Sequence, residues 1–176
     1  MPLVETMTPA SKSPYALQKR IMEEMCELWS SVYGLETVVL RYFNVYGPRM
    51  DPEGAYALAI GKFIKQRREG KPMTIWGDGT QTRDFTYITD VVQANLLAAR
   101  SPKIGKGEII NTGAGRNISV NAVAALIGGP IVNEEERLEP KDALADNTKA
   151  RELLGWTPTV LIEDGIALLK LEAGLP

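Results

Sequence analysis

The chain has 176 residues, of which 44% are hydrophobic, and carries 20 Lys and Arg against 22 Asp and Glu, a formal net charge of −2. It contains no histidine and a single cysteine, Cys26. These counts exclude histidine-based catalytic triads, histidine-ligated metals, thiolate metal clusters and an internal disulfide. Any acid–base chemistry must therefore use carboxylate, lysine, tyrosine or hydroxyl groups.

The charge balance and the apolar runs also bear on partners and location. A slightly acidic chain provides no basic field for nucleic acid. No apolar run reaches the roughly 18 residues that a membrane span requires. Residues 1–5 lack the basic and apolar regions of a signal peptide. We therefore expect a cytoplasmic protein that binds neither membrane nor nucleic acid.

Helical and β signals alternate along the chain, beginning with a polar, proline-marked arm over residues 1–12. Ser13 and Pro14 mark the start of a first helix, and Gly34 marks its end near residue 33. Further helices are expected at residues 55–69, 90–100, 119–127, 147–154 and 162–172. Strands are expected at residues 37–43, 73–76, 84–88 and 108–111, and loops at residues 44–54 and 133–142. The alternation predicts the α/β class.

The first helix has more apolar surface than a surface helix needs, since such a helix ordinarily has one apolar face. The residues that cover more than one stripe are Ala16, Leu17, Ile21, Met22, Met25, Cys26, Leu28, Trp29 and Val32. Either this is a central core helix, or one of its faces meets something outside this chain.

Tyr15 and Lys19 lie four residues apart, so both project from one face of this helix, one turn apart. A phenol beside an ammonium is a usable acid–base pair, because the positive charge favours the phenolate. Alone, a Tyr-x-x-x-Lys pattern is weak evidence, because in most helices it is a solvated pair without function.

Five segments along the chain resemble, in order and spacing, the extended short-chain dehydrogenase/reductase family. They are Ser13-Pro14-Tyr15-Ala16-Leu17-Gln18-Lys19 and the segments at residues 40–49, 76–90, 111–113 and 145–158. Within its NAD-dependent epimerase/dehydratase members, the nearest resemblance is to nucleotide-sugar 4-epimerases that act on UDP-glucose or UDP-N-acetylglucosamine. Residues 51–57 favour the N-acetyl type. The resemblance covers residues 13–165.

The resemblance implies a chemical role for three residues. Tyr15 would be the general base that takes the proton from the sugar 4-hydroxyl as hydride passes to NAD⁺. Lys19 would favour the phenolate form of Tyr15 and hydrogen-bond the nicotinamide ribose. Tyr42 would sit beside the nicotinamide.

The resemblance also implies five substrate-binding residues. Asn44 would bind the phosphate–sugar side of the substrate. Arg83 would contact the nucleotide diphosphate, because a guanidinium fork suits two oxygens. Trp76 and Phe85 would lie near the uracil and ribose, and Asp142 matches an aspartate of the last substrate loop.

Each of these assignments has a structural alternative. Tyr42, Trp76 and Phe85 are equally suited to be core aromatics. Arg83 could form a local ion pair with Asp84, its neighbour in sequence.

The chain also departs from the family pattern. The glycine-rich dinucleotide fingerprint is absent, because residues 113–115 (Gly-Ala-Gly) follow a predicted strand without a third glycine or a suitably placed acidic residue. Ser11 and Ser13 are too near Tyr15 to supply the family's catalytic hydroxyl. Glu139 stands where the last loop usually has an arginine, and Arg137 could replace that arginine only if the loop were repositioned.

We therefore expect an incomplete Rossmann-like fold, the rear of the parallel sheet with its helices, together with a small α/β substrate-binding lobe. Residues 1–48 would hold the catalytic helix and the following strand of a truncated NAD-binding domain. Residues 49–176 would form mainly the nucleotide-sugar-binding lobe, with residues 84–112 returning to the sheet.

The function expected from these observations is the C-terminal part of an NAD-dependent nucleotide-sugar 4-epimerase, inactive alone. NAD would serve the full-length family but would not bind this chain alone. Binding of a UDP-sugar would be weak or absent, and the chain would self-associate, most simply as a homodimer. Two alternatives stay open: a non-catalytic remnant or nucleotide-binding module, and part of a 4,6-dehydratase, reductase or decarboxylase of the same family.

Overall fold

The computed structural model describes residues 1–11, 13–54, 58–136 and 140–176. Helices and strands alternate within these ranges, as the α/β class requires. The helices are α1 Pro14–Tyr33, α2 Ala59–Arg68, α3 Ile88–Ala98, α4 Val120–Ile127, α5 Thr148–Leu154 and α6 Ile162–Glu172. The strands are β1 Thr37–Tyr42, β2 Val45–Tyr46, β3 Met73–Trp76, β4 Thr82–Asp84, β5 Thr86–Tyr87, β6 Lys106–Thr112, β7 Asn117–Ser119 and β8 Ile131–Glu134.

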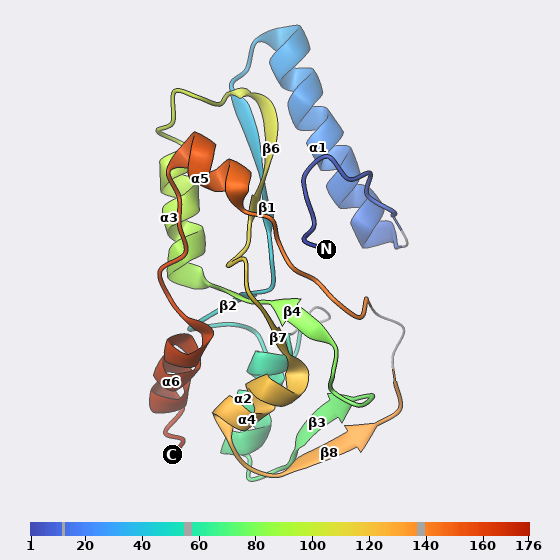
Figure 1. Cartoon of the computed structure of the whole chain (residues 1–176), viewed down its shortest axis with the longest axis vertical. Helices are drawn as coiled ribbons and strands as arrows, with labels where there is room; N and C mark the ends of the chain where they lie inside the picture. The colour runs from blue at the N-terminus through green and yellow to red at the C-terminus, as the bar shows by residue number, and fades with distance from the viewer. Residues whose placement is uncertain (12, 55–57, 137–139) are drawn as a thin grey trace.

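Strands β1 and β6 form a parallel pair that is covered on both faces. Helix α1 lies on one side of this pair, and α3 with α5 lies on the other (Figure 1). The core beneath α3 and α5 is apolar and consists of Ala94, Ala98, Ile110, Ala150, Leu154 and Trp156. This arrangement has the layered form of a parallel α/β sheet.

The second hydrophobic core lies among short strands and three helices, at the opposite end of the molecule from the β6 start (Figure 1). Here β2 pairs with β5 and β3 with β8 in parallel, whereas β4 pairs with β7 antiparallel. Helices α2, α4 and α6 pack around these pairs. The largest fully buried side chains of this core include Tyr46, Ile60, Phe63, Met73 and Ile75. The predicted boundary between two units at residue 48 stays a prediction.

Five predicted elements differ from the structure. Strand β8 occupies part of the loop expected at 133–142, and it gives no alternating pattern because all four of its residues are exposed. The strand expected at 84–88 is divided into β4 and β5. Strand β7 is absent from the prediction, and β2, which pairs with β5, lies inside the loop expected at 44–54. Helix α3 begins at Ile88 rather than Asp90, and the Asp90 carboxylate in its first turn binds the 159–160 segment. Residues 55–57 of the expected second helix lie outside the described residues.

Helix α1 begins and ends as predicted. The Ser13 hydroxyl accepts a hydrogen bond from the backbone N–H of Ala16 at 3.1 Å, Pro14 is the first helical residue, and Gly34 ends the helix at φ 67°. None of the α1 residues is buried. Its large exposed apolar side chains are Leu17, Ile21, Met22, Met25, Leu28, Trp29, Val32 and Tyr33. Within the described residues α1 is therefore not a central core helix, and one of its faces stays uncovered.

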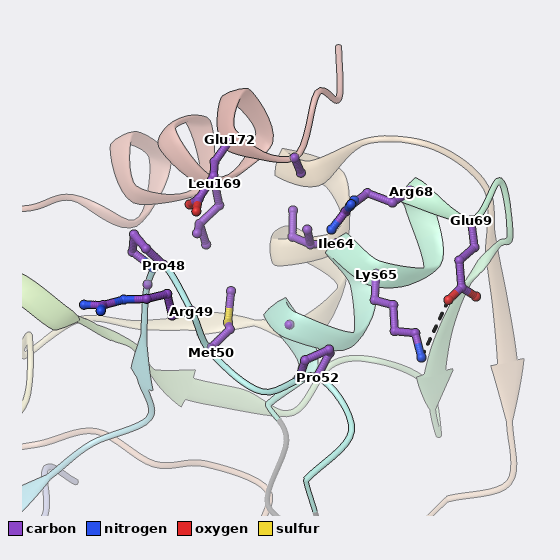
Figure 2. Close-up of a pocket in the computed structure, with 13 residues that line it drawn as sticks. Pro48, Arg49, Met50, Pro52, Ile64, Lys65, Arg68, Glu69, Leu169 and Glu172 are labelled. Carbon is purple, nitrogen blue, oxygen red and sulfur yellow. Dashed lines mark ion pairs between the residues drawn. The ribbon is translucent and has the colours of Figure 1, made fainter.

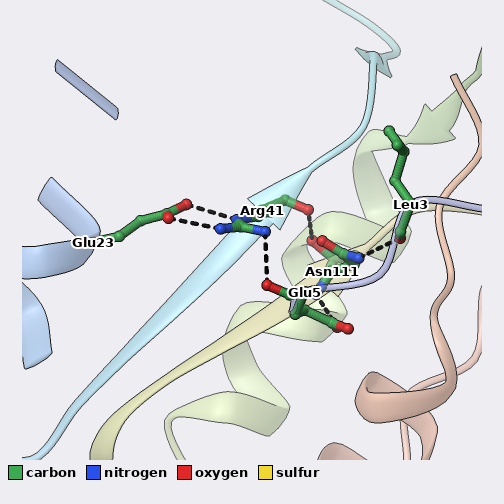
Figure 3. Close-up of polar contacts among 6 residues, drawn as sticks. Leu3, Glu5, Glu23, Arg41 and Asn111 are labelled. Atoms are coloured by element: carbon green, nitrogen blue, oxygen red, sulfur yellow. Dashed lines mark hydrogen bonds and ion pairs between the residues drawn. The ribbon is translucent and has the colours of Figure 1, made fainter. Parts of the chain in front are cut away.

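The N-terminal arm is attached to the end of the sheet. The backbone N–H of Leu3 donates to the carbonyl of Leu144 at 2.7 Å, and the N–H of Asp146 donates to the carbonyl of Leu3 at 3.0 Å. The Asn111 amide at the end of β6 donates to the Leu3 carbonyl at 2.8 Å (Figure 3). The arm therefore has a defined position beside the start of α1.

Candidate functional site

The Tyr15 and Lys19 side chains lie together on α1. The Lys19 Nζ atom is 5.4 Å from the centroid of the Tyr15 ring, a cation–π distance. Both residues line a cavity of about 400 Å³ that Phe43 and Asn111 also line. Residues of the N-terminal arm line it as well. Tyr15 is 45% exposed, so its phenol is accessible to a ligand.

Tyr42 lies apart from this pair. Successive side chains of a strand point to opposite faces, and Arg41 points towards α1, where it bonds to Glu23. Tyr42 therefore points to the α3 face, where its hydroxyl donates to the Asn95 side chain at 2.9 Å. The structure does not bring the Tyr42 side chain to the Tyr15 cavity.

Four of the five predicted substrate-binding residues line a second cavity, of about 240 Å³. They are Asn44, Trp76, Arg83 and Phe85. Trp76 ends β3, Arg83 lies within β4, and Asn44 and Phe85 lie just before β2 and β5, so only the folded chain brings these residues together. The cavity combines a guanidinium, an amide and two aromatic rings. Such a set can hold an anionic group beside a planar one.

Backbone contacts position this set. The Asn44 amide donates to the carbonyl of Asp84 at 3.0 Å, and Asn44 has a positive φ of 32°, which is uncommon for a residue other than glycine. The Arg83 Nη1 atom donates to the carbonyls of Thr82 at 2.8 Å and Lys141 at 3.3 Å. These bonds orient the guanidinium beside the 140–142 segment.

Asp142 does not line this cavity. Its Oδ1 atom accepts a hydrogen bond from the Thr82 hydroxyl at 2.7 Å, next to Arg83 in sequence. The carboxylate therefore joins the last loop to β4 near the cavity. Glu139, which stands where the family has an arginine, and Arg137, which could replace that arginine, lie outside the described residues.

In the Gly113-Ala114-Gly115 turn, the N–H groups of residues 114 and 115 are not free to bind a pyrophosphate. The N–H groups of Ala114 and Gly115 donate to the Asp84 carboxylate at 2.8 and 3.0 Å, and the N–H of Ala145 joins them at 3.0 Å. A Cβ at Gly113 would overlap the Ala145 side chain, so this glycine serves close packing. Of the groups that an NAD site needs, Tyr15 and Lys19 would serve only the nicotinamide ribose end. The described residues provide no cradle for the pyrophosphate at this turn.

Sequence reasoning missed three polar residues of the second cavity, Lys62, Thr74 and Gln81. Lys62 lies on the face of α2 that also carries Ala59 and Phe63, at helical spacings of three and four residues. This spacing could have indicated that Lys62 faces the interior, because Ala59 and Phe63 on the same helix face are both apolar. The Gln81 amide donates to the carbonyl of Trp76 at 2.9 Å and closes the turn between β3 and β4.

A larger cavity, of about 640 Å³, contains none of the predicted site residues. It lies between the 47–52 loop, α2 and α6, with Pro48 and Met50 on one side and Ile64 and Leu169 nearby (Figure 2). Lys65 lines it and forms an ion pair with Glu69. This cavity and the second cavity, of about 240 Å³, lie along different faces of α2. The predicted residues line the smaller cavities: Tyr15 and Lys19 the one of about 400 Å³, and Asn44, Trp76, Arg83 and Phe85 the one of about 240 Å³.

Comparison with known proteins identifies the family. The model of the NAD dependent epimerase/dehydratase family matches residues 2–113, more than half of the chain. The chain belongs to this family. This membership confirms the resemblance drawn from the sequence segments. Among the described residues, no helix is both long and apolar enough to cross a membrane.

Relatives of this family resemble the chain over nearly its whole length. A UDP-glucuronate 4-epimerase of Thermodesulfobacterium geofontis is 39% identical over 162 residues, 88% of this chain and 48% of the relative. The UDP-glucose 4-epimerase of Thermotoga maritima, solved with UDP-glucose, superposes with a TM-score of 0.88 at 39% identity, covering 98% of this chain and 57% of that one. The UDP-glucuronic acid 4-epimerase of Bacillus cereus, solved with UDP-glucuronic acid and NAD, gives 0.87 at 35% identity, with 99% and 56% covered.

These superpositions confirm the predicted Rossmann-like α/β fold class. The chain spans about half the length of the curated relatives that it matches.

Proposed function

We propose that this chain carries the catalytic helix and the nucleotide-sugar-binding lobe of an NAD-dependent UDP-sugar 4-epimerase. The observation that carries the proposal is the cavity shared by Asn44, Trp76, Arg83 and Phe85. Its support from relatives is that the Thermotoga enzyme was solved with UDP-glucose and the Bacillus enzyme with UDP-glucuronic acid and NAD.

Tyr15 and Lys19 would perform the proton transfer. The Tyr15 phenolate would accept the proton of the sugar 4-hydroxyl, and the Lys19 ammonium beside the ring would favour that phenolate. NAD, when bound, supplies an acceptor for the hydride that leaves sugar carbon 4. Tyr15 would also return the proton to the sugar 4-oxygen as the hydride comes back to the opposite face of carbon 4, and the two residues would hold the nicotinamide ribose.

The second cavity would hold the nucleotide. The Arg83 guanidinium would form paired hydrogen bonds to the diphosphate, and Trp76 and Phe85 would contact the uracil and ribose. Asn44 would bind the phosphate–sugar side. Asp142 would stabilise the edge of this cavity by accepting the hydrogen bond from Thr82.

These 176 residues alone would bind no NAD and would turn over no UDP-sugar. The sequence has no glycine-rich fingerprint, and the N–H groups of Ala114 and Gly115 are engaged by Asp84. Isothermal titration calorimetry with NAD⁺ tests this, and micromolar binding by this chain would overturn it.

Calorimetric titration of UDP into the chain and its Arg83→Ala variant tests the nucleotide site. UDP is expected to bind the unmodified chain weakly and the variant at least about tenfold more weakly, because a charge-assisted hydrogen bond contributes about 1.5–3 kcal/mol. Arg116→Ala is the matched control, since Arg116 binds Glu163 on the surface and does not line the cavity. Equal affinities for all three proteins would remove Arg83 from the site.

We also propose that the chain self-associates through the uncovered apolar face of α1. The face carries Leu17, Ile21, Met25 and Leu28, each about half exposed, and exposed apolar area of this kind favours association. Light scattering at micromolar concentration is expected to give more than the monomer mass. A monomer that also fails to bind a dye for exposed apolar surface would contradict the proposal.

A further inference from the structure

Glu23 and Arg41 form a two-point ion pair between α1 and β1. The Arg41 Nε and Nη2 atoms each donate to a different Glu23 carboxylate oxygen at 2.7 Å (Figure 3). The side chains are only 14% and 22% exposed, so water competes little for either partner. Hydrogen bonding to Glu23 raises the pKa of Arg41 above its ordinary value, and the guanidinium therefore stays charged.

Arg41 is itself held on three sides. It is paired with Asn111 across the β1–β6 ladder, and its carbonyl accepts the Thr112 hydroxyl at 3.2 Å. Its Nη1 atom reaches the carbonyl of Glu5 at 3.5 Å. The Glu5 carboxylate in turn accepts the Asn111 N–H at 2.8 Å (Figure 3). The sheet thus holds the Arg41 backbone, and the N-terminal arm contacts its guanidinium, in addition to the contacts with Glu23.

The ion pair lies next to the proposed acid–base pair. Tyr15, Lys19 and Glu23 follow one another at four-residue intervals on α1, and all three line the 400 Å³ cavity with Arg41. A carboxylate four residues from Lys19 is within reach of its ammonium. Glu23 is therefore the natural competitor of the Tyr15 ring for Lys19.

The other charged groups that face this cavity do not compete. Besides Lys19, Glu23 and Arg41, its lining includes one charged residue, Arg20. Arg20 donates from Nε to Glu24 at 2.9 Å, on the exposed side of α1. Among the described residues, Lys19 forms no ion pair with a carboxylate. Its recorded contact is the one with Tyr15.

We propose that Arg41 is a positioning residue for the Tyr15–Lys19 pair. By engaging both oxygens of Glu23, it prevents Glu23 from drawing the Lys19 ammonium away from the Tyr15 ring. The inference rests on the proposed function, since it assigns Lys19 its role through Tyr15. Arg41 itself touches no reacting atom.

The test measures where the Lys19 side chain lies. Protons over an aromatic ring are shifted upfield, so the Lys19 ε-methylene NMR signal of the full chain reports its contact with Tyr15, and Tyr15→Leu gives the value without the ring. Arg41→Met is expected to lose this upfield shift as fully as Tyr15→Leu does. The double variant Glu23→Gln/Arg41→Met is expected to regain it, because the competing carboxylate is gone. Arg116→Met, which breaks a distant Arg–Glu pair, should leave the signal unchanged.

A merely structural role for Arg41 predicts the opposite pattern. The double variant would then lose the shift as the single variant does, and this result would overturn the inference. If Arg41→Met fails to fold, Glu23→Gln/Arg41→Met is compared with Arg41→Lys, which keeps one contact to Glu23 and should retain part of the shift. If Tyr15→Leu does not move the Lys19 signal, the Tyr15–Lys19 pair of the proposed function fails. If Tyr15→Leu moves the Lys19 signal and Arg41→Met does not, only the Arg41 inference fails.

Discussion

Gly165 of α6 lies so close to Tyr46 of β2 that a Cβ at position 165 would overlap the Tyr46 hydroxyl. Tyr46 is 1% exposed and packs edge-to-face against Tyr87, with ring centroids 5.3 Å apart. Its hydroxyl has no hydrogen-bond partner among the described residues. The absence of a side chain at Gly165 therefore allows α6 to cover the core of the lobe.

Replacing Gly165 by alanine should destabilise the chain. In most helix interiors this change stabilises by about 0.5–1 kcal/mol. Here the added methyl group has no space, and overpacking costs about 1–3 kcal/mol. Urea unfolding followed by circular dichroism should therefore show a lower free energy of unfolding for Gly165→Ala.

The double variant Gly165→Ala/Tyr46→Phe is the control, because it removes the hydroxyl that the methyl group would meet. Only part of the lost stability should return, because the ring atoms Cζ and Cε2, at 2.8 and 2.9 Å from the added Cβ, would still be too close. Tyr46→Phe alone should cost little, since the hydroxyl makes no hydrogen bond within the described residues. A Gly165→Ala variant as stable as the unmodified chain would refute the close contact.

Asp90→Ala should be among the most destabilising single changes. The carboxylate is 2% exposed and accepts the N–H and hydroxyl of Thr159 at 3.1 and 2.7 Å and the N–H of Val160 at 3.1 Å. Removing it leaves these donors unpaired, at a cost of about 3 kcal/mol. Chemical denaturation measures this loss. Asp78→Ala, which removes an exposed turn carboxylate bonded to Thr80, should cost less than about 1 kcal/mol.

The features that sequence predicted correctly depend on local chemistry or on recognisable segments. Ser13, Pro14 and Gly34 fix the bounds of α1 through capping, which needs no distant partner. Asn44 and Arg83 stand in segments whose residue order marks the family, so their meeting in one cavity could be anticipated.

The features that sequence missed depend on contacts between distant segments. Strand β8 exists because it pairs with β3, and none of its own residues is buried. Lys62 joins the cavity only because of the orientation that α2 adopts. Asp84 adjoins Arg83 in sequence, but its carboxylate is fully buried against N–H groups from two other segments, which no local pattern reveals.

Asp84 should give the stability of the chain a defined pH dependence. Burial raises its pKa above the ordinary value of 3.8, although hydrogen bonds from the N–H groups of Ala145, Gly115 and Ala114 act in the opposite direction. The folded chain therefore keeps this proton to a higher pH than the unfolded chain. From pH 3.8 up to the raised pKa, the contribution of Asp84 to the free energy of unfolding should fall as pH rises.

Urea unfolding of the unmodified chain and of Asp84→Asn across this range measures that contribution, because asparagine does not titrate. The difference in unfolding free energy should change only within the window and be constant above it. Asp146→Asn provides a contrast, since the bonds from Thr148 lower the pKa of Asp146 and place its window below 3.8. A carboxyl carbon titration of Asp84 with a midpoint at or below 3.8 would contradict the prediction.

Lys62→Ala should weaken UDP binding if the second cavity holds the nucleotide diphosphate. Lys62 lines this cavity with Arg83, so its ammonium can face the phosphates that Arg83 is proposed to bind. A hydrogen bond to a charged group contributes about 1.5–3 kcal/mol, so calorimetry should show an affinity at least about tenfold lower. Lys65→Ala is the matched control, because Lys65 lies one turn further along α2, lines the other cavity and pairs with Glu69. If both lysine variants bound UDP equally well, Lys62 would have no part in the site; if both weakened binding equally, the effect would come from net charge rather than from the cavity.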